Sequence, residues 1–417
     1  MPSRPLSPKS APRPLPPLAL SFDQLVRPSV EQEARLLRAA AQIWRLAPWE
    51  TWGEDRLFIV RHPETSELGF VGVIGGSKQQ MGVIVYRGAD AYFALLDFVE
   101  RASMSPLPGW LNDMAAKGVN TDTLPTDLTA FMEQMSGAMV DPTELLRIPQ
   151  LQLNFDARQD LDPLDLEWIK RHSYSAKGRA FPTFRAFVPG FLPWWISQDD
   201  AGLLSVALEQ LVGLCPRPGF NPATLEAKES GARKPVHELF ARLPKTGKSG
   251  ETTWSDARLK VSPGDGGAYA VEIDPDEQLL ERIAALPQGQ ANLEMELVSL
   301  PTPLGGDQER PCFPSLLLAG SGGQIVASET IPCGAPSPYL FTPLLNAILG
   351  VLAAQNERPV ALQFASPEMA LLGAVGEMTG IPVQMIDELQ TLDPAIEELM
   401  GQLESGELFA DTEENNG

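Results

Sequence analysis

The chain has 417 residues, a formal net charge of −22 and a hydrophobic fraction of 43%. This length exceeds what a single hydrophobic core usually serves, so we expect two or three domains. The composition is that of a folded soluble protein, and no segment supplies the roughly 18 uninterrupted apolar residues of a membrane span. Because residues 1–17 also lack the apolar core of a signal peptide, we expect a cytoplasmic protein without a membrane partner.

Much of the negative charge lies at the C-terminal end. Residues 359–417 contain twelve Asp and Glu and neither Lys nor Arg. A field of this sign repels phosphate backbones, so nucleic-acid binding is disfavoured. We expect residues 404–417 to form a solvated acidic tail.

The N-terminal half begins with a Pro-rich segment, residues 1–20, which predicts an extended and disordered leader. Apolar residues at helical spacing then predict a helix over 29–44. Three apolar runs separated by short turn-rich segments indicate an antiparallel β-meander. These runs cover residues 56–60, 69–74 and 81–86. A helix from 88 to about 100 is expected to follow.

The rest of this half mixes helices and strands. We expect one or two helices within 103–149, around 124–139, then strands at 151–155 and 184–188 with a helix near 164–172 between them. Ser197, with Asp200 three residues on, is a plausible N-cap for a helix that runs to about 213. Six aromatic residues just before it either supply core area or line a ligand pocket. They are Phe181, Phe184, Phe187, Phe191, Trp194 and Trp195.

A Pro-rich and polar stretch after Cys215 predicts a linker over 216–235. The expected organisation is then a leader, an N-terminal module, a linker, a C-terminal module and a tail. Their expected bounds are 1–20, 21–215, 216–235, 236–403 and 404–417.

The C-terminal module is expected to contain a mixed segment, with a helix at 276–285 and a strand at 293–300, followed by a regular series of elements. Runs at 315–320 and 324–331 flank a Gly-rich turn and predict a β-hairpin. Helix, strand, helix, strand and helix then alternate, which implies a mostly parallel sheet with helical cover. Their expected ranges are 339–355, 359–365, 366–380, 381–386 and 394–403. The fold class is therefore α+β or α/β.

Several motifs suggest chemistry but lack an essential residue or context. Residues 245–249 resemble the end of a phosphate-binding loop, yet Arg242 stands where that motif requires Gly, and the preceding segment 237–243 is predicted to be helical. His237 and Glu238 open like a zinc motif whose second ligand position holds Ala241. The segment around Ser321 resembles a nucleophile elbow but joins two strands.

The remaining polar residues indicate no active site. His62, His172 and His237 show no paired spacing, and Cys215, Cys312 and Cys333 show neither zinc nor disulfide spacing, so we expect the cysteines to be small buried hydrophobes. Carboxylates at positions 55, 156, 160 and 162 are the remaining candidates, namely Asp55, Asp156, Asp160 and Asp162. We therefore assign no catalytic, cofactor-binding or metal-binding residue and predict no cofactor.

The order of hairpin, helix, strand and helix in the C-terminal module resembles the start of RNase H-like and integrase folds. That resemblance implies metal-binding carboxylates on adjacent strands. They would fall near Ala319 or Gly320 and near Ser366, and none of these residues has a carboxylate. The resemblance therefore implies a catalytically silent module.

A broader resemblance is to an uncharacterised bacterial family of paired domains of unknown function. In the first module it rests on residues 57–60, 69–75 and 86–88, and in the second on 310–314, 322–325, 358–359, 380–383 and 392–393. It spans about residues 31–403, implies architecture without an activity, and expects an acidic residue where this chain has Gly320 and Ser321.

Two hypotheses about function follow. The first is a non-catalytic interaction or regulatory protein that binds a protein partner through the Pro-rich leader and the acidic tail. The second is a hydrolase or nuclease-related enzyme with an unrecognised carboxylate metal site.

Overall fold

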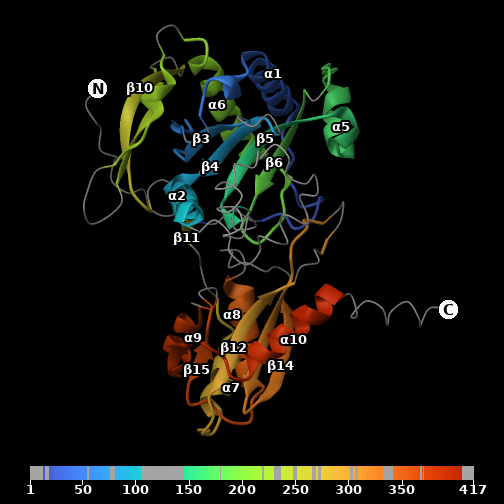
Figure 1. Ribbon diagram of the computed structural model, residues 1–417, viewed down its shortest axis with the longest axis vertical. Helices are drawn as coiled ribbons and strands as arrows, with labels where there is room; N and C mark the ends of the chain where they lie inside the picture. Colours follow the sequence, from blue (N-terminus) through green and yellow to red (C-terminus); the bar gives the residue numbers. More distant parts are fainter. Residues whose placement is uncertain are drawn as a thin grey trace, which may run out of the picture. The chain divides into compact units, whose positions relative to one another are not determined.

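The computed structural model describes most of the chain (Figure 1). The described residues are 13–14, 18–53, 56–75, 80–104, 145, 147–178, 180–217, 220–229, 236–247, 251–264, 269–270, 274–300, 304–305, 309–331, 341–366, 369 and 371–405. Most of the predicted leader, the helices expected around 124–139 and most of the acidic tail lie outside them.

Contacts within the chain divide it into two compact units. Unit 1 comprises Met1–Arg13, Asp23–Val188 and Pro193–Tyr269. Unit 2 comprises Pro14–Phe22, Pro189–Leu192 and Ala270–Gly417. Backbone hydrogen bonds join the two short segments of unit 2, Pro14–Phe22 and Pro189–Leu192, to its main part. The Arg310 amide donates to Leu20 O at 2.8 Å, and the Leu192 amide donates to Pro311 O at 2.9 Å.

Unit 1 is built on one large sheet with the strand order β10-β9-β2-β3-β4-β5-β6-β7, in which β8 also pairs with β9. All neighbours are antiparallel except β2 and β9, which are parallel. The strands are β2 (Phe58–Arg61), β3 (Leu68–Ile74), β4 (Gly82–Arg87), β5 (Gln150–Asp156), β6 (Phe181–Phe187), β7 (Trp194–Trp195), β8 (Lys228–Glu229), β9 (His237–Thr246) and β10 (Thr252–Val261). The predicted meander is confirmed as β2, β3 and β4.

Helices cover both faces of this sheet (Figure 1). The core on one face joins the sheet to α1 and α6, which pack on each other, and to α5. The core on the other face joins it to α2. The helices are α1 (Val30–Leu46), α2 (Gly88–Met104), α5 (Pro163–Arg171) and α6 (Gln198–Leu214), with the 3-10 helices η1 (Pro48–Glu50), η4 (Arg158–Asp160) and η5 (Pro222–Leu225).

Two helices begin with complete capping boxes, and the one at Ser197 confirms the predicted N-cap. Ser29 caps α1 and Ser197 caps α6, each with a reciprocal bond from the third helical residue, Gln32 and Asp200 respectively. Such capping boxes satisfy backbone donors that have no partner inside the helix.

Strand β9 corrects a prediction. The segment 237–243, expected to be helical, is the first part of β9, which pairs with β10 on one side and with β2 on the other. Both faces of β9 are covered, because Leu239 and Ala241 contact one core and Phe240 the other. Residues 236–261, expected in the C-terminal module, are therefore continuous with the sheet of unit 1. Within the expected linker, Leu225 is buried in the unit 1 core.

Unit 2 contains a five-stranded mixed sheet with the order β14-β13-β12-β15-β16. The antiparallel hairpin of β13 and β14 pairs with β12, while β12, β15 and β16 are parallel. The strands are β12 (Leu293–Ser299), β13 (Ser315–Ser321), β14 (Gln324–Ile331), β15 (Leu362–Phe364) and β16 (Val383–Met385), and β1 (Arg13–Pro14) with β11 (Tyr269–Ala270) forms a separate pair.

Four helices of unit 2 lie on its two sheet faces. The larger core joins one face to α7 (Glu277–Ala285), α8 (Phe341–Ala353) and α9 (Leu372–Thr379). A smaller core joins the other face to α10 (Leu392–Ser405). Gly380 ends α9 in the left-handed conformation, as the sequence predicts. The two mixed sheets and their helices give the chain an α+β fold. None of the described helices is long and apolar enough to cross a membrane.

Candidate functional site

Two of the four acids that the sequence offers as candidates, Asp156 and Asp162, bind separate partners in unit 1. Asp156 Oδ2 accepts a hydrogen bond from Thr183 Oγ1 at 2.7 Å. Asp162 Oδ2 accepts one from Arg185 Nη2, also at 2.7 Å, and Asp160 lies exposed in η4. Asp55 lies outside the described residues.

The three histidines also have separate partners. His62 Nδ1 accepts two backbone N–H groups of its own turn, at 3.3 and 3.2 Å. His172 Nε2 lies 2.8 Å from Glu33 Oε2, and His237 Nδ1 lies 2.9 Å from the Tyr92 hydroxyl. Because His237 stands on a strand, it lacks the helix on which the zinc motif depends.

The other two motifs also lie in structural contexts. The segment 245–249 begins inside β9, which forms a hairpin with β10, and residues 248–250 lie outside the described part. Ser321 Oγ donates to Asn292 O at 2.8 Å, so this hydroxyl links the end of β13 to the residue that precedes β12. Among the described residues, no group of three or more His, Cys, Asp or Glu side chains is arranged to hold a metal ion.

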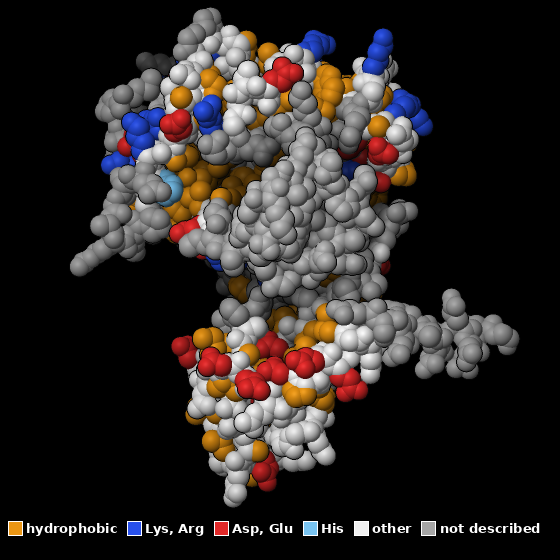
Figure 2. Space-filling model, in the orientation of Figure 1, with side chains coloured by type: hydrophobic (Ala, Val, Ile, Leu, Met, Phe, Trp, Pro, Cys, Tyr) orange, Lys and Arg blue, Asp and Glu red, His pale blue; other side chains and the backbone are white. Residues whose placement is uncertain are grey.

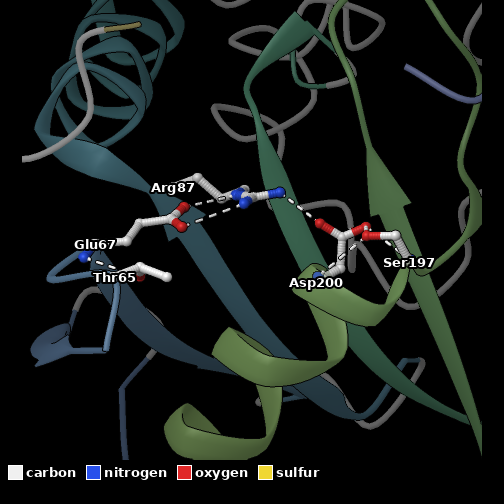
Figure 3. Close-up of polar contacts among 5 residues, drawn as sticks. All are labelled: Thr65, Glu67, Arg87, Ser197 and Asp200. Carbon is white, nitrogen blue, oxygen red and sulfur yellow. Dashed lines mark hydrogen bonds and ion pairs between the residues drawn. The ribbon is translucent and has the colours of Figure 1, made fainter. Parts of the chain in front are cut away.

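A buried ion cluster that no motif indicated ties β4 to α6 (Figure 3). Arg87 Nε donates to Glu67 Oε1 at 2.9 Å, and Arg87 Nη1 donates to Asp200 Oδ1 at 2.5 Å. Glu67 and Asp200 are only 8% and 7% exposed, so Arg87 supplies the charge that keeps both carboxylates stable in the interior. Asp200 also accepts from the Ser197 amide and hydroxyl at the start of α6.

Two members of the aromatic cluster lie in the core, and two contribute to a small hollow. Phe181 and Phe184 belong to the unit 1 core. Phe184 and Trp195 also line a small hollow together with Trp168, Leu25, Arg27, Pro28, Leu164, Asp165 and Ile196. Beside it the Arg185 guanidinium lies over the Trp195 ring at 4.2 Å and binds Asp165. Burial raises the pKa of the Asp165 carboxyl, and the hydrogen bonds from Arg185 oppose that rise.

In unit 2, two buried glutamates stand on the central strand β12. Glu294 and Glu296 are 8% and 7% exposed and share one face, because strand residues two apart point the same way. Glu296 Oε2 accepts the amides of Ala365 and Ser366, both at 3.1 Å, and Oε1 accepts the Ser366 hydroxyl at 2.5 Å. The RNase H-like resemblance places a carboxylate near Ser366. In the structure the carboxylate beside Ser366 is that of Glu296 on β12.

Glu294 holds the start of helix α10. Its Oε2 accepts the amides of Thr391 and Leu392 at 2.8 and 3.0 Å, where the helix dipole favours negative charge. Gly320 on β13 lets the helix approach, because an added Cβ would come within 2.8 Å of both Leu392 Cδ2 and Thr391 Cγ2. The family resemblance expects an acidic residue at Gly320. The close approach of α10 explains why a glycine stands there instead.

The charge of the chain is divided unequally between the units. Residues 270–417 hold 23 of the 54 Asp and Glu but only three of the 32 Lys and Arg. The three are Arg282, Arg310 and Arg358, and each donates to a backbone carbonyl of unit 2. Figure 2 shows Asp and Glu side chains gathered on one face of this unit. Among the described acids of residues 270–417, twelve are exposed: Asp274, Asp276, Glu277, Glu281, Glu309, Glu329, Glu357, Glu377, Asp387, Glu388, Glu397 and Glu398.

Comparison with known proteins identifies both parts of the chain. Residues 34–112 and 122–238 match the family model described as domain of unknown function DUF7309, and residues 279–400 match the one described as domain of unknown function DUF6930. No curated protein and no solved structure matches the chain.

Proposed function

We propose that this chain, which joins a DUF7309 domain to a DUF6930 domain, is a non-catalytic interaction protein of the cytoplasm. Its partner is a protein with a basic surface, bound by the acidic DUF6930 unit. The observation that carries the proposal is the division of charge, which gives residues 270–417 a formal charge of −20 and leaves −2 for the rest.

The exposed acids of unit 2 are available for a partner because its arginines are engaged elsewhere. Arg310 is buried and donates to Ala19 O at 3.1 Å, and Arg358 donates to Thr379 O at 2.5 Å. A surface of one sign attracts and orients a partner of the opposite sign and raises the association rate. The same field repels nucleic acid, which supports a protein partner.

Affinity capture with a matched variant tests this proposal. The tagged chain and a variant with Glu388, Glu397 and Glu398 changed to Gln would be incubated with native lysate, with and without nuclease. We expect a stoichiometric basic protein on the parent chain that persists after nuclease and is lost from the variant in quantitative mass spectrometry. A partner lost on nuclease treatment, or retained equally by the variant, would contradict the proposal.

One observation favours the alternative of a carboxylate metal site. The strand order of unit 2 supports the RNase H-like hypothesis, and Glu294 and Glu296 lie together on its central strand. Both carboxylates already accept backbone amides, so a divalent cation would have to displace those bonds. If the alternative holds, Mg²⁺ or Mn²⁺ raises the melting temperature of the chain, and Glu296→Gln abolishes that rise while Asp156→Asn does not.

A further inference from the structure

Strand β14 forms an outer edge of the unit 2 sheet. Among the described residues it pairs with β13 on one side, and no strand pairs with its other side. Its side chains from Gln324 to Thr330 are exposed except for the half-buried Ala327. An edge strand of this kind carries a row of backbone donors and acceptors that can pair with another extended chain.

The part of β14 suited to such pairing is its regular segment. A bulge beside Gly320 gives β14 one additional residue, Val326, and disrupts the ladder near the turn. From Ala327 to Ile331 the register with β13 is regular, which provides an uninterrupted edge of about 17 Å at the usual rise per residue. Ile325 and Val326, which are 44% and 42% exposed, form an apolar surface at one end of this edge.

The negative charge around β14 favours a basic segment as the partner of this edge. Glu329 projects from the regular segment and is exposed, and the unit around it carries the −20 charge described above. A second copy of the chain would place Glu329 and two such fields together, which is unfavourable. A strand with Lys or Arg opposite Glu329 gains the favourable cross-strand pair.

From these observations we infer that the edge of β14 between Ala327 and Ile331 binds an extended basic segment of a protein partner, which adds a strand to the unit 2 sheet. This inference rests on the proposed function and specifies its surface and the form of the bound segment.

Binding of model peptides to the full chain tests the inference. The probe is a short peptide in which Lys alternates with Val, and its controls carry Glu in place of Lys or N-methyl groups on one hydrogen-bonding edge. We expect binding of the Lys peptide alone in fluorescence anisotropy, with hydrogen-exchange protection confined to residues 324–331. Glu329→Lys is expected to weaken binding by about tenfold or more, whereas Glu377→Lys on α9 leaves it unchanged. Circular dichroism establishes that both variants fold.

The outcomes separate this inference from the proposed function. Binding of the Lys peptide with protection elsewhere, or equal binding by Glu329→Lys, overturns the β14 surface and leaves the acidic unit as the binding partner of a basic protein. Equal binding of the Lys and Glu peptides, or of neither, overturns both. Protection of β14 without peptide, accompanied by a dimer in sedimentation equilibrium, identifies a second copy as the occupant and overturns the inference.

Discussion

Gly320 on β13 lies directly beneath Thr391, at the start of helix α10: a Cβ added at Gly320 would come within 2.8 Å of Thr391 Cγ2. We expect Gly320→Ala to push the helix from the sheet and to weaken the bonds from its amides to Glu294. The expected loss is about 1–3 kcal/mol of unfolding free energy, typical of overpacking. Urea denaturation of the full chain measures it.

Gly401, which lies on helix α10 itself, provides the control. Nothing lies within 4 Å of a Cβ added at Gly401, so Gly401→Ala should stabilise α10 by up to about 1 kcal/mol through helix propensity. If the two variants changed stability in the same direction, the close approach at Gly320 would not be what limits that position.

Arg87 holds the two buried carboxylates of unit 1, so its replacement should be costly. Arg87→Met leaves Glu67 and Asp200 without their shared cation, and we expect a loss of about 3–5 kcal/mol in unfolding free energy. Arg35→Met removes an ion pair to Glu209 whose side chains are 40% and 39% exposed, and should cost less than about 1 kcal/mol. Adding Glu67→Gln and Asp200→Asn to Arg87→Met should recover part of the loss. If Arg87→Met lowered the free energy of unfolding no more than Arg35→Met does, the Arg87 cluster would not stabilise the fold.

Local patterns in the sequence predict much of this fold. Ser29 and Ser197 mark the starts of α1 and α6 because a capping box is complete within four residues. The turn between β13 and β14 is predicted from the glycines at 322 and 323. In the structure both adopt positive φ, which few other residues tolerate. These features depend on neighbours in the chain and are therefore visible without the structure.

Features that depend on distant residues are not visible in this way. Strand β9 is covered on both faces, so its apolar residues run without strict alternation, and periodicity alone cannot distinguish it from a buried helix. The Arg87 cluster joins residues 20 and 113 positions apart, and no spacing rule connects them. The sequence gives one indication of the buried pair Glu294 and Glu296, because these two acids alternate with apolar residues in a strand.

Glu296 is expected to anchor the segment after β15 through its charge. Its oxygens accept hydrogen bonds from four donors, which are the amides of Leu297, Ala365 and Ser366 and the Ser366 hydroxyl. Glu296→Gln therefore turns an NH₂ group toward one or more of these donors and leaves polar groups unsatisfied. We expect a loss of about 1–3 kcal/mol in unfolding free energy. Glu398→Gln, at an exposed position of α10, should change stability by less than about 0.5 kcal/mol. Equal effects of the two substitutions would exclude an anchoring role.

Cys215, at the C-cap of α6, should react slowly as long as the chain is folded. Burial raises the pKa of its thiol from 9.0 to about 11, so the folded state holds about 100-fold less thiolate than the unfolded chain at pH 8. Alkylation of Cys215, followed by mass spectrometry, should therefore be about 100-fold slower in the native protein than in urea.

The same shift predicts how stability depends on pH. Between pH 9 and about 11 the unfolded chain loses the thiol proton while the folded chain keeps it. The unfolded state then binds fewer protons, so this group lowers the free energy of unfolding as the pH rises through that window. Cys215→Ala should reduce this alkaline loss, which urea denaturation at pH 8 and pH 10.5 measures. An unchanged pH dependence in Cys215→Ala, together with rapid native alkylation, would show that the thiol is not shielded as the structure indicates.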